Sequence, residues 1–183
     1  MEFNKRNMKI FLISGKARNG KDTTADIIRN YYDKKNMKTT NDSYAYYMKD
    51  YAKRITGWDG SDETKPREFL QQFGTNLVRS KIDDNFFIDR MVGDLKVFEY
   101  FYDIVTISDG RFPNELDTIK NNFDNVTTFK IYRPNFDNGL TEEQKEHPSE
   151  TALDNYENYD YVVENNGTVE DLRNKIEKIL EEM

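Results

Sequence analysis

Several residue types are scarce in this chain, and each scarcity removes a class of protein. The chain has no cysteine, which excludes disulfide scaffolds, thiolate zinc sites and cysteine nucleophiles and favours a reducing compartment. Its single histidine, His147, leaves little room for imidazole chemistry. No apolar run approaches the ~18 residues of a membrane span, and the opening MEFNKRNMK lacks the apolar stretch of a secretory signal. We therefore expect a soluble, cytoplasmic protein with no membrane partner.

Basic residues are also outnumbered, with 27 Lys and Arg against 34 Asp and Glu and a formal net charge of -7. This balance disfavours binding along a nucleic-acid backbone unless basic side chains gather in one place. Any polyanion that the protein binds should therefore be small, and we expect no nucleic-acid partner. The 183 residues suffice for one α/β domain with its own packed core, and their pattern leaves open whether that domain forms a homodimer.

Short apolar segments alternate with helical ones, which is typical of a parallel sheet covered by helices on both faces. The predicted strands are residues 9–14, 103–108, 126–132 and 159–164, and residues 34–42 form a connection or a weak edge strand. Helices are predicted from Lys21, over 43–55 with Ser43 as the cap, from Pro66 through Val78, over 86–102 and from Thr168. Residues 133–150 are polar and aperiodic, as lids or disordered segments often are. The fold class is α/β, a three-layer α/β/α sandwich with a mostly parallel sheet and a lid insertion.

A glycine-rich motif joins the first strand to its helix. Residues 15–21, GKARNGK, match G-x-x-x-x-G-K between a buried strand and a helix, which is the context of a P-loop. Glycines let backbone N–H groups approach phosphate oxygens, the helix start adds a positive field, and the lysine reaches the β and γ phosphates. A plain strand-to-helix turn would explain the glycines but not an ammonium group at a helix start. The predicted nucleotide-binding residues here are Gly15, Arg18, Asn19, Gly20 and Lys21.

The position after the lysine departs from the general motif, because Asp22 stands where a Ser or Thr hydroxyl usually meets Mg²⁺. A carboxylate can hold the metal directly or through water, although it also repels the phosphates. This departure argues against GTPase and ATPase switches. Thr23 becomes the candidate for an α-phosphate contact.

A second charged block, ISDGRFPNE, follows the strand predicted over residues 103–108. Asp109 stands at the carboxyl end of that strand, where metal and substrate bind in open α/β sheets, and could orient Mg²⁺ waters. Arg111 could reach the transferred phosphoryl group or the acceptor phosphate with two hydrogen bonds. The structural alternative is that Asp109 caps the helix beginning near Pro113 and that Arg111 is a surface charge.

These blocks resemble one family. The run SGKARNGKDTTADII is similar to the opening of the bacteriophage deoxynucleoside monophosphate kinases, whose P-loop ends in Gly-Lys-Asp-Thr, and less so to animal-type phosphomevalonate kinases. The block ISDGRFPNE resembles the Ser-Asp-x-Arg-Phe-x-Asn-Glu segment of the phage enzymes. SYAYYMKDYAKRITG, REFLQQFGTNLVR, Arg133-Pro134 with HPSE, and ENNGTVEDL resemble further segments in the same order. The stretch 85–102 departs most, which leaves the acceptor's identity open.

The resemblance implies the P-loop kinase fold over residues 1–183, with an acceptor-binding helical region near 43–102 and a lid near 133–150. It implies ATP and Mg²⁺, the latter held by Asp22 and Asp109, and nucleotide substrates. Asn165 would contact the donor nucleotide, and Arg133 would act from the lid. The implied substrate-binding residues are Arg67, Gln71, Gly74, Arg79, Arg111 and Glu115. For Arg67, Gln71 and Arg79, a solvated helix face is an equally good interpretation.

The expected reaction transfers the γ-phosphoryl group of ATP to a (deoxy)nucleoside 5′-monophosphate. An acceptor phosphate is mostly a dianion at neutral pH, since its second pKa is ~6, so no general base is required. Lys21 and Mg²⁺ would neutralise the donor, Arg111 and Arg79 would hold the acceptor, and Arg18 or Arg133 would close over the transferred group, with Asp109 beside the metal. Alternatives are a kinase of phosphomevalonate or dephospho-coenzyme A type, a nucleotide-binding protein with degraded catalysis, and a nucleic-acid end kinase.

Overall fold

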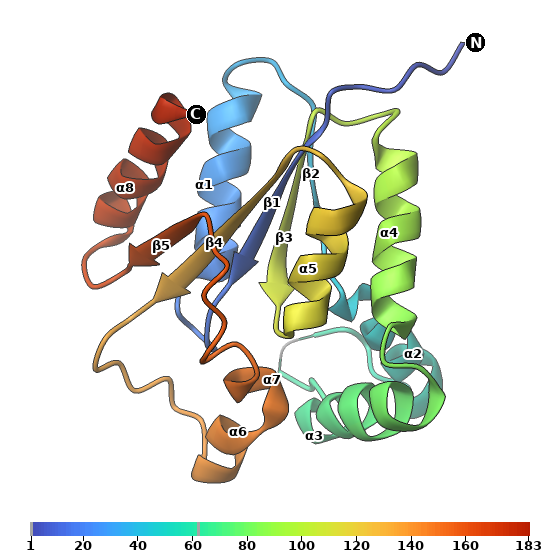
Figure 1. The fold of residues 1–183 in the computed structure, drawn as a ribbon. Coiled ribbons are helices and arrows are strands. Elements are labelled where there is room, and N and C mark those ends of the chain that lie inside the picture. Colours follow the sequence, from blue (N-terminus) through green and yellow to red (C-terminus); the bar gives the residue numbers. More distant parts are fainter. Residues whose placement is uncertain (1, 62) are drawn as a thin grey trace.

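The computed structural model describes residues 2–61 and 63–183, and in this part of the chain five parallel strands form one sheet. The strand order is β2-β3-β1-β4-β5, so the first strand lies at the centre (Figure 1). The strands are β1 Lys9–Ser14, β2 Thr39–Asp42, β3 Ile104–Gly110, β4 Val126–Tyr132 and β5 Tyr161–Glu164. Because every strand runs the same way, all five carboxyl ends meet at one edge of the sheet.

Helices cover both faces of the sheet and gather at its carboxyl edge. One face carries α1 (Lys21–Asp33) and α8 (Val169–Glu182), and the other carries α4 (Phe86–Phe98) and α5 (Pro113–Asn122), as Figure 1 shows. The remaining helices lie beyond the strand ends: α2 Ala45–Thr56, α3 Arg67–Gln71, η1 Gln72–Ile82, α6 Glu142–Glu146 and α7 Pro148–Thr151. The three-layer α/β/α architecture is therefore confirmed.

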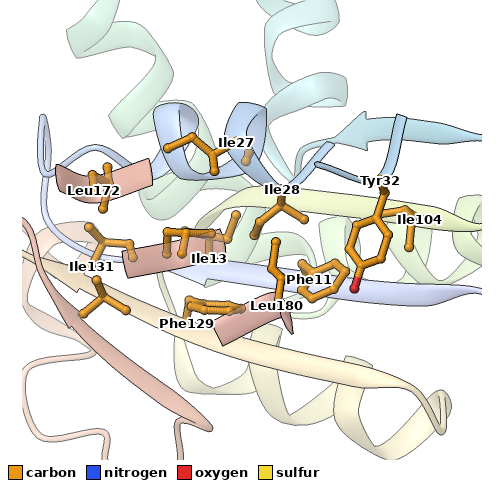
Figure 2. Packing of buried hydrophobic residues seen from close by; sticks show 13 residues of the cluster. Phe11, Ile13, Ile27, Ile28, Tyr32, Ile104, Phe129, Ile131, Leu172 and Leu180 are labelled. Atoms are coloured by element: carbon orange, nitrogen blue, oxygen red, sulfur yellow. The ribbon is translucent and has the colours of Figure 1, made fainter. Parts of the chain in front are cut away.

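The central strand β1 divides its apolar side chains between two cores. Phe11 and Ile13 pack against α1 and α8 with Ile28 and Leu172, and Figure 2 shows this cluster. The alternate residues of β1 belong to the opposite cluster, which includes the apolar side chains of α4 and α5. A strand buried on both faces reads as a continuous apolar run, which is why KIFLIS was recognisable in the sequence.

The sequence-based element boundaries are mostly right. β1 and β4 have the predicted limits, the edge strand exists as β2, and β3 continues to Gly110, two residues beyond its predicted end at Ser108. The aperiodic segment after β4 contains two short helices, α6 and α7, each begun by a side-chain cap from Thr141 or His147. Among the helices of residues 2–61 and 63–183, none combines the length and apolarity needed to cross a bilayer.

The helical stretch after Pro66 has an unexpected form. Over η1 (Gln72–Ile82) the backbone is π-helical, and the amide of Asp83 still donates to the carbonyl of Val78, 2.9 Å away. Gly74 in this helix lies so close to α2 that a Cβ would stand 2.7 Å from the Met48 sulfur. Extended π-helix is rare and has no simple sequence signature, so the pattern predicted a helix but not its winding.

Candidate functional site

The P-loop wraps from the end of β1 to the start of α1 and lies at the carboxyl edge of the sheet (Figure 1). Its two glycines are required by geometry. Gly15 has φ +148°, and a Cβ there would come 2.2 Å from the carbonyl oxygen of Ile131 on the neighbouring strand β4. Gly20 has φ +98° and precedes the first residue of α1, where a Cβ would meet the Asn165 amide at 2.5 Å. The loop can therefore pack this closely only without side chains at these positions.

Two asparagines hold the loop in place. The Asn19 side chain donates through Nδ2 to the carbonyl of Ile131 at 3.2 Å, and the Asn165 side chain donates to the carbonyl of Asn19 at 2.9 Å. Asn165 follows β5, so the end of that strand supports the loop from the α8 side. The resemblance implies a nucleotide contact for Asn165. In this structure the Asn165 amide NH₂ donates to the P-loop backbone and helps to position the loop.

Lys21 begins α1 and is buried, with 8% of its surface exposed. Its ammonium donates to the carbonyl of Lys16 within the same loop, 2.9 Å away. Burial and, to a smaller extent, the nearby Arg111 guanidinium lower the pKa of Lys21 from 10.5 to about 8, against the raising effect of Glu150 and Asp22. A buried cation that satisfies itself on its own backbone is poised to exchange that contact for an anion.

Asp22 and Thr23 occupy the first turn of α1. Asp22 is exposed and accepts a hydrogen bond from the Ser108 hydroxyl at 2.6 Å, which ties α1 to the end of β3. Thr23 is half-buried, and its neighbour Thr24 donates to the carbonyl of Gly20 at 2.9 Å. A carboxylate beside a hydroxyl supplies the hard oxygen donors that Mg²⁺ prefers.

Asp109 contacts α2, whereas Ser108 contacts α1, and the two residues lie where the register of β3 shifts against β1. The two carboxylate oxygens of Asp109 accept the amides of Tyr44 at 3.0 Å and Ala45 at 2.9 Å, the first N–H groups of α2. It therefore caps α2, for which the sequence predicted Ser43 as the cap. Asp109 does not cap the helix that begins at Pro113. Burial raises the pKa of the Asp109 carboxyl, while the two amides act in the opposite direction.

Arg111 follows β3 and reaches back over the P-loop. Its guanidinium donates to the Glu150 carboxylate at 2.6 Å and to the carbonyl oxygens of Ser149 and Gly15 at 3.3 and 3.4 Å. The other oxygen of Glu150 accepts the backbone amide of Ala17, inside the P-loop, at 2.9 Å. An anionic oxygen thus already lies on a P-loop amide, with an arginine beside it.

Arg79 and Glu115 form a buried ion pair near that arginine, with side chains 9% and 3% exposed. Glu115 also accepts the backbone amides of Arg111 at 2.6 Å and of Phe112 at 3.1 Å, so it fixes the turn that carries Arg111. Burial raises the pKa of Glu115 to about 7, against the lowering effect of Arg79. Arg79 further donates to the carbonyl of Asp84 at 3.0 Å and lies 4.1 Å over the Phe112 ring.

The remaining predicted residues lie farther from the P-loop. Arg67 is exposed at the start of α3, and Gln71 is half-buried at its end. Within residues 2–61 and 63–183, no hydrogen bond or ion pair joins either of them to residues 15–21. Arg133 follows β4, and its guanidinium stacks 3.7 Å over the Phe136 ring.

Two cavities adjoin the outer side of the P-loop. One has a volume of about 240 Å³ and lies between the loop, the end of β4 and α7. The other, of about 430 Å³, lies beneath residues 135–138. Lys16, Arg133 and Glu150 line both, so two cations and one carboxylate stand between the loop and residues 133–160, the β4–β5 connection.

Sequence reasoning missed several residues of this site. Glu150 appeared only as part of the lid-boundary block HPSE, although it contacts both the P-loop and Arg111. Ser108 stood unnoticed before Asp109, and Lys16 was unassigned, although it forms a 2.9 Å ion pair with Asp154. The signal available for Glu150 was its place in a block that resembles a lid boundary. The spacing of the sequence did not show that its partners are Ala17 and Arg111.

Comparison with known proteins found a matching family and a curated relative. The model of the family described as Deoxynucleotide monophosphate kinase matches residues 37–176. A protein of Acanthamoeba polyphaga mimivirus, whose name of deoxynucleotide monophosphate kinase is itself provisional, is 35% identical over 121 residues. That match spans 61% of this chain and 58% of the viral relative's length.

Solved structures share the fold at low sequence identity. The Mycobacterium tuberculosis APS kinase in complex with AMPPNP and APS has a TM-score of 0.60 at 10% identity, over 96% of this chain and 99% of that one. The dephospho-CoA kinase from Campylobacter jejuni has a TM-score of 0.52 at 12% identity, over 96% and 97%. Shikimate kinase from Aquifex aeolicus gives 0.51 at 17% identity, over 95% and 96%. The fold is thus that of the P-loop kinases, and the chain belongs to the deoxynucleotide monophosphate kinase family.

Proposed function

We propose that this protein transfers the γ-phosphoryl group of ATP to the 5′-phosphate of a deoxynucleoside monophosphate, giving ADP and the deoxynucleoside diphosphate. The observation that carries the proposal is the convergence of a buried lysine and an arginine on a P-loop that already binds an anionic oxygen. The Ala17 amide donates to a carboxylate, Arg111 donates to the same carboxylate, and Lys21 starts the adjoining helix. Family membership supports the choice of acceptor.

The chemistry asks little of the protein beyond charge and position. A phosphate oxygen of the acceptor attacks the γ-phosphorus, a new O–P bond forms, and the bond to the β-phosphate oxygen breaks with its electrons leaving on ADP. The attacking phosphate is mostly dianionic at neutral pH because its second pKa is ~6. No side chain has to remove a proton, which agrees with a chain that has a single histidine.

The predicted residues of the donor cradle, the lid and the acceptor region each have a role in this proposal. Gly15, Arg18, Asn19, Gly20 and Thr23 form the donor cradle with Lys21, and Arg111 contacts the transferred group. Residues 133–150 act as the lid, from which Arg133 closes. The acceptor lies against the helical region 43–102, near Arg67, Gln71, Gly74, Arg79 and Glu115. Two of these residues, Arg79 and Glu115, are paired with each other and act through the Arg111 turn.

Asp22 is the residue that fits Mg²⁺, since its carboxylate is exposed and stands beside the Ser108 hydroxyl. Bound there, the metal would offset the negative charge of the donor phosphates. Each oxygen of Asp109 accepts one α2 amide, and we propose that this residue acts on the metal through water. We propose that the ion arrives with ATP. We place the enzyme in the cytoplasm, that of the host if a phage encodes it, acting on free nucleotides rather than on nucleic acid.

A phosphoryl-transfer assay tests the proposal. Purified protein would be incubated with ATP, Mg²⁺ and a panel of deoxynucleoside and nucleoside monophosphates, phosphomevalonate and dephospho-coenzyme A, with diphosphate formation measured by chromatography. Lys21→Ala should lower transfer by about 10³-fold or more. Lys34→Ala is the matched control, because Lys34 is exposed at the other end of α1. A Lys21→Ala enzyme within tenfold of the wild type, or ATP hydrolysis without any acceptor product, would contradict the proposal.

A further inference from the structure

Glu150 lies on α7 of the β4–β5 connection, and its side chain is 8% exposed. One carboxylate oxygen accepts the Ala17 amide at 2.9 Å, and the other accepts the Arg111 guanidinium at 2.6 Å. The proposed function assigns Arg111 to the transferred phosphoryl group, and Ala17 lies inside the P-loop between Gly15 and Gly20. Glu150 therefore lies where two phosphate-directed donors meet.

A carboxylate oxygen and a phosphate oxygen make the same demand on such a site. Each carries negative charge, accepts hydrogen bonds from amides and pairs with guanidinium groups. Ala17 has one backbone N–H, so it cannot bond both anions at full strength, and two like charges side by side would repel. A donor phosphate that takes the Ala17 amide must displace Glu150.

Further contacts hold the same connection against the loop. Arg18 donates to the carbonyl of Asn138 at 2.8 Å, and Lys16 pairs with Asp154 at 2.9 Å. Together with Glu150, these residues attach the β4–β5 connection to three successive P-loop residues, 16, 17 and 18. Glu150 is the only one of the three anchors that also contacts Arg111, a residue outside the loop.

We propose that Glu150 is a positioning residue that occupies the phosphate site of the nucleotide-free protein, holds Arg111 beside the Ala17 amide, and gives up both contacts when the donor phosphates bind. The inference rests on the proposed function, because it assigns the P-loop to a phosphate. Arg111 then passes from a carboxylate to a phosphoryl group without moving through a solvated state. The consequence is a lower affinity for phosphate, because anions must compete with a tethered carboxylate, at a site where Arg111 is already in position.

The test uses Glu150→Gln, which keeps the shape and one oxygen acceptor but removes the charge. Glu146→Gln is the matched control, because Glu146 is exposed on the neighbouring helix α6 and its replacement changes the net charge equally. Inorganic pyrophosphate is the probe, and its dissociation constant is measured by calorimetric titration of the full-length protein. We expect Glu150→Gln to bind pyrophosphate about tenfold more tightly than the wild type, as for the loss of one competing charged contact. Glu146→Gln should stay within twofold.

A second readout follows the connection itself. Lys145 lies between the anchors at residues 138 and 150, so trypsin cleavage there reports release of the segment. Without ligand, Glu150→Gln should be cut faster than the wild type, in which the residues on both sides of this bond are the same. Unchanged or weaker pyrophosphate binding by Glu150→Gln, with unchanged cleavage, overturns the inference and leaves the proposed function standing. If neither the wild type nor the variant binds pyrophosphate, the P-loop is not a phosphate site and both proposals fall.

Discussion

Replacing Arg79 with Met should destabilise the protein by an amount that depends on pH. The change removes the cation from the buried pair with Glu115 and leaves that carboxyl with the backbone amides of Arg111 and Phe112. Breaking a buried pair from one side commonly costs ~3–5 kcal/mol, because the remaining charge is uncompensated. Glu115 can escape this penalty by taking up a proton, and its pKa is already raised to about 7 by burial.

The sign of the pH effect follows from this pKa. Glu115 ionises with a pKa of 4.5 when unfolded and about 7 when folded, so its contribution to stability falls as pH rises from 4.5 towards 7. Without Arg79 the folded pKa should be higher still, and the fall should continue to higher pH. We expect the free energy of unfolding of Arg79→Met to be ~1–2 kcal/mol below that of the wild type near pH 5.5, where Glu115 is protonated in both proteins. Near pH 8.5 the difference should be ~3–5 kcal/mol.

Urea unfolding at the two pH values measures these differences, with Arg90→Met as the control. Arg90 is exposed and stacks on the rings of Tyr47 and Phe86, so its loss should be small and independent of pH. In the double variant Arg79→Met, Glu115→Gln, the penalty should be smaller than the sum of the single ones by more than ~1 kcal/mol. Equal losses for Arg79→Met at both pH values, or strict additivity, would refute the view that these residues act as one pair.

Two further predictions concern the charged groups of the site. Because the pKa of Lys21 is lowered to about 8, kcat/KM for ATP should fall above about pH 8. The free energy of unfolding should rise between about pH 8 and 10.5, because in that range only the unfolded lysine keeps its proton. Lys21→Met should abolish that rise in stability, and a flat activity profile to pH 10 would contradict the assignment. Asp109→Asn should lower the free energy of unfolding by ~1 kcal/mol through the weakened α2 cap, and it should raise the Mg²⁺ concentration needed for activity less than Asp22→Asn does. A shift in Asp109→Asn as large as that in Asp22→Asn would instead make Asp109 a direct metal ligand.

The parts of the fold that could be predicted are those in which local pattern decides the structure. The apolar run before Gly15, the P-loop itself and the helix from Lys21 are contiguous, so one stretch of sequence specifies all three. The weak strand β2 and the helix caps after β4 were less visible, because short polar segments take their structure from neighbours.

The sequence was enough to locate the site, but it did not show which side chains of the site bond to each other. Arg79 and Glu115 both looked like substrate ligands, yet they lie 36 residues apart in sequence and bond to each other. Asp109 stands at the strand end where a metal ligand was expected, but its side chain reaches α2 amides that only the tertiary fold brings near. Glu150 shows the same limit, since 133 residues separate it from its P-loop partner.

The end of β3 has a consequence for how the two halves of the site can vary. Ser108 holds the first turn of α1 through Asp22, and the next residue, Asp109, holds the first turn of α2. The spacing between α1 and α2 is therefore fixed by adjacent residues of one strand. Lengthening the loop after α2 should leave this spacing intact, whereas a single residue inserted ahead of Ser108 would turn both side chains to the wrong faces of the sheet.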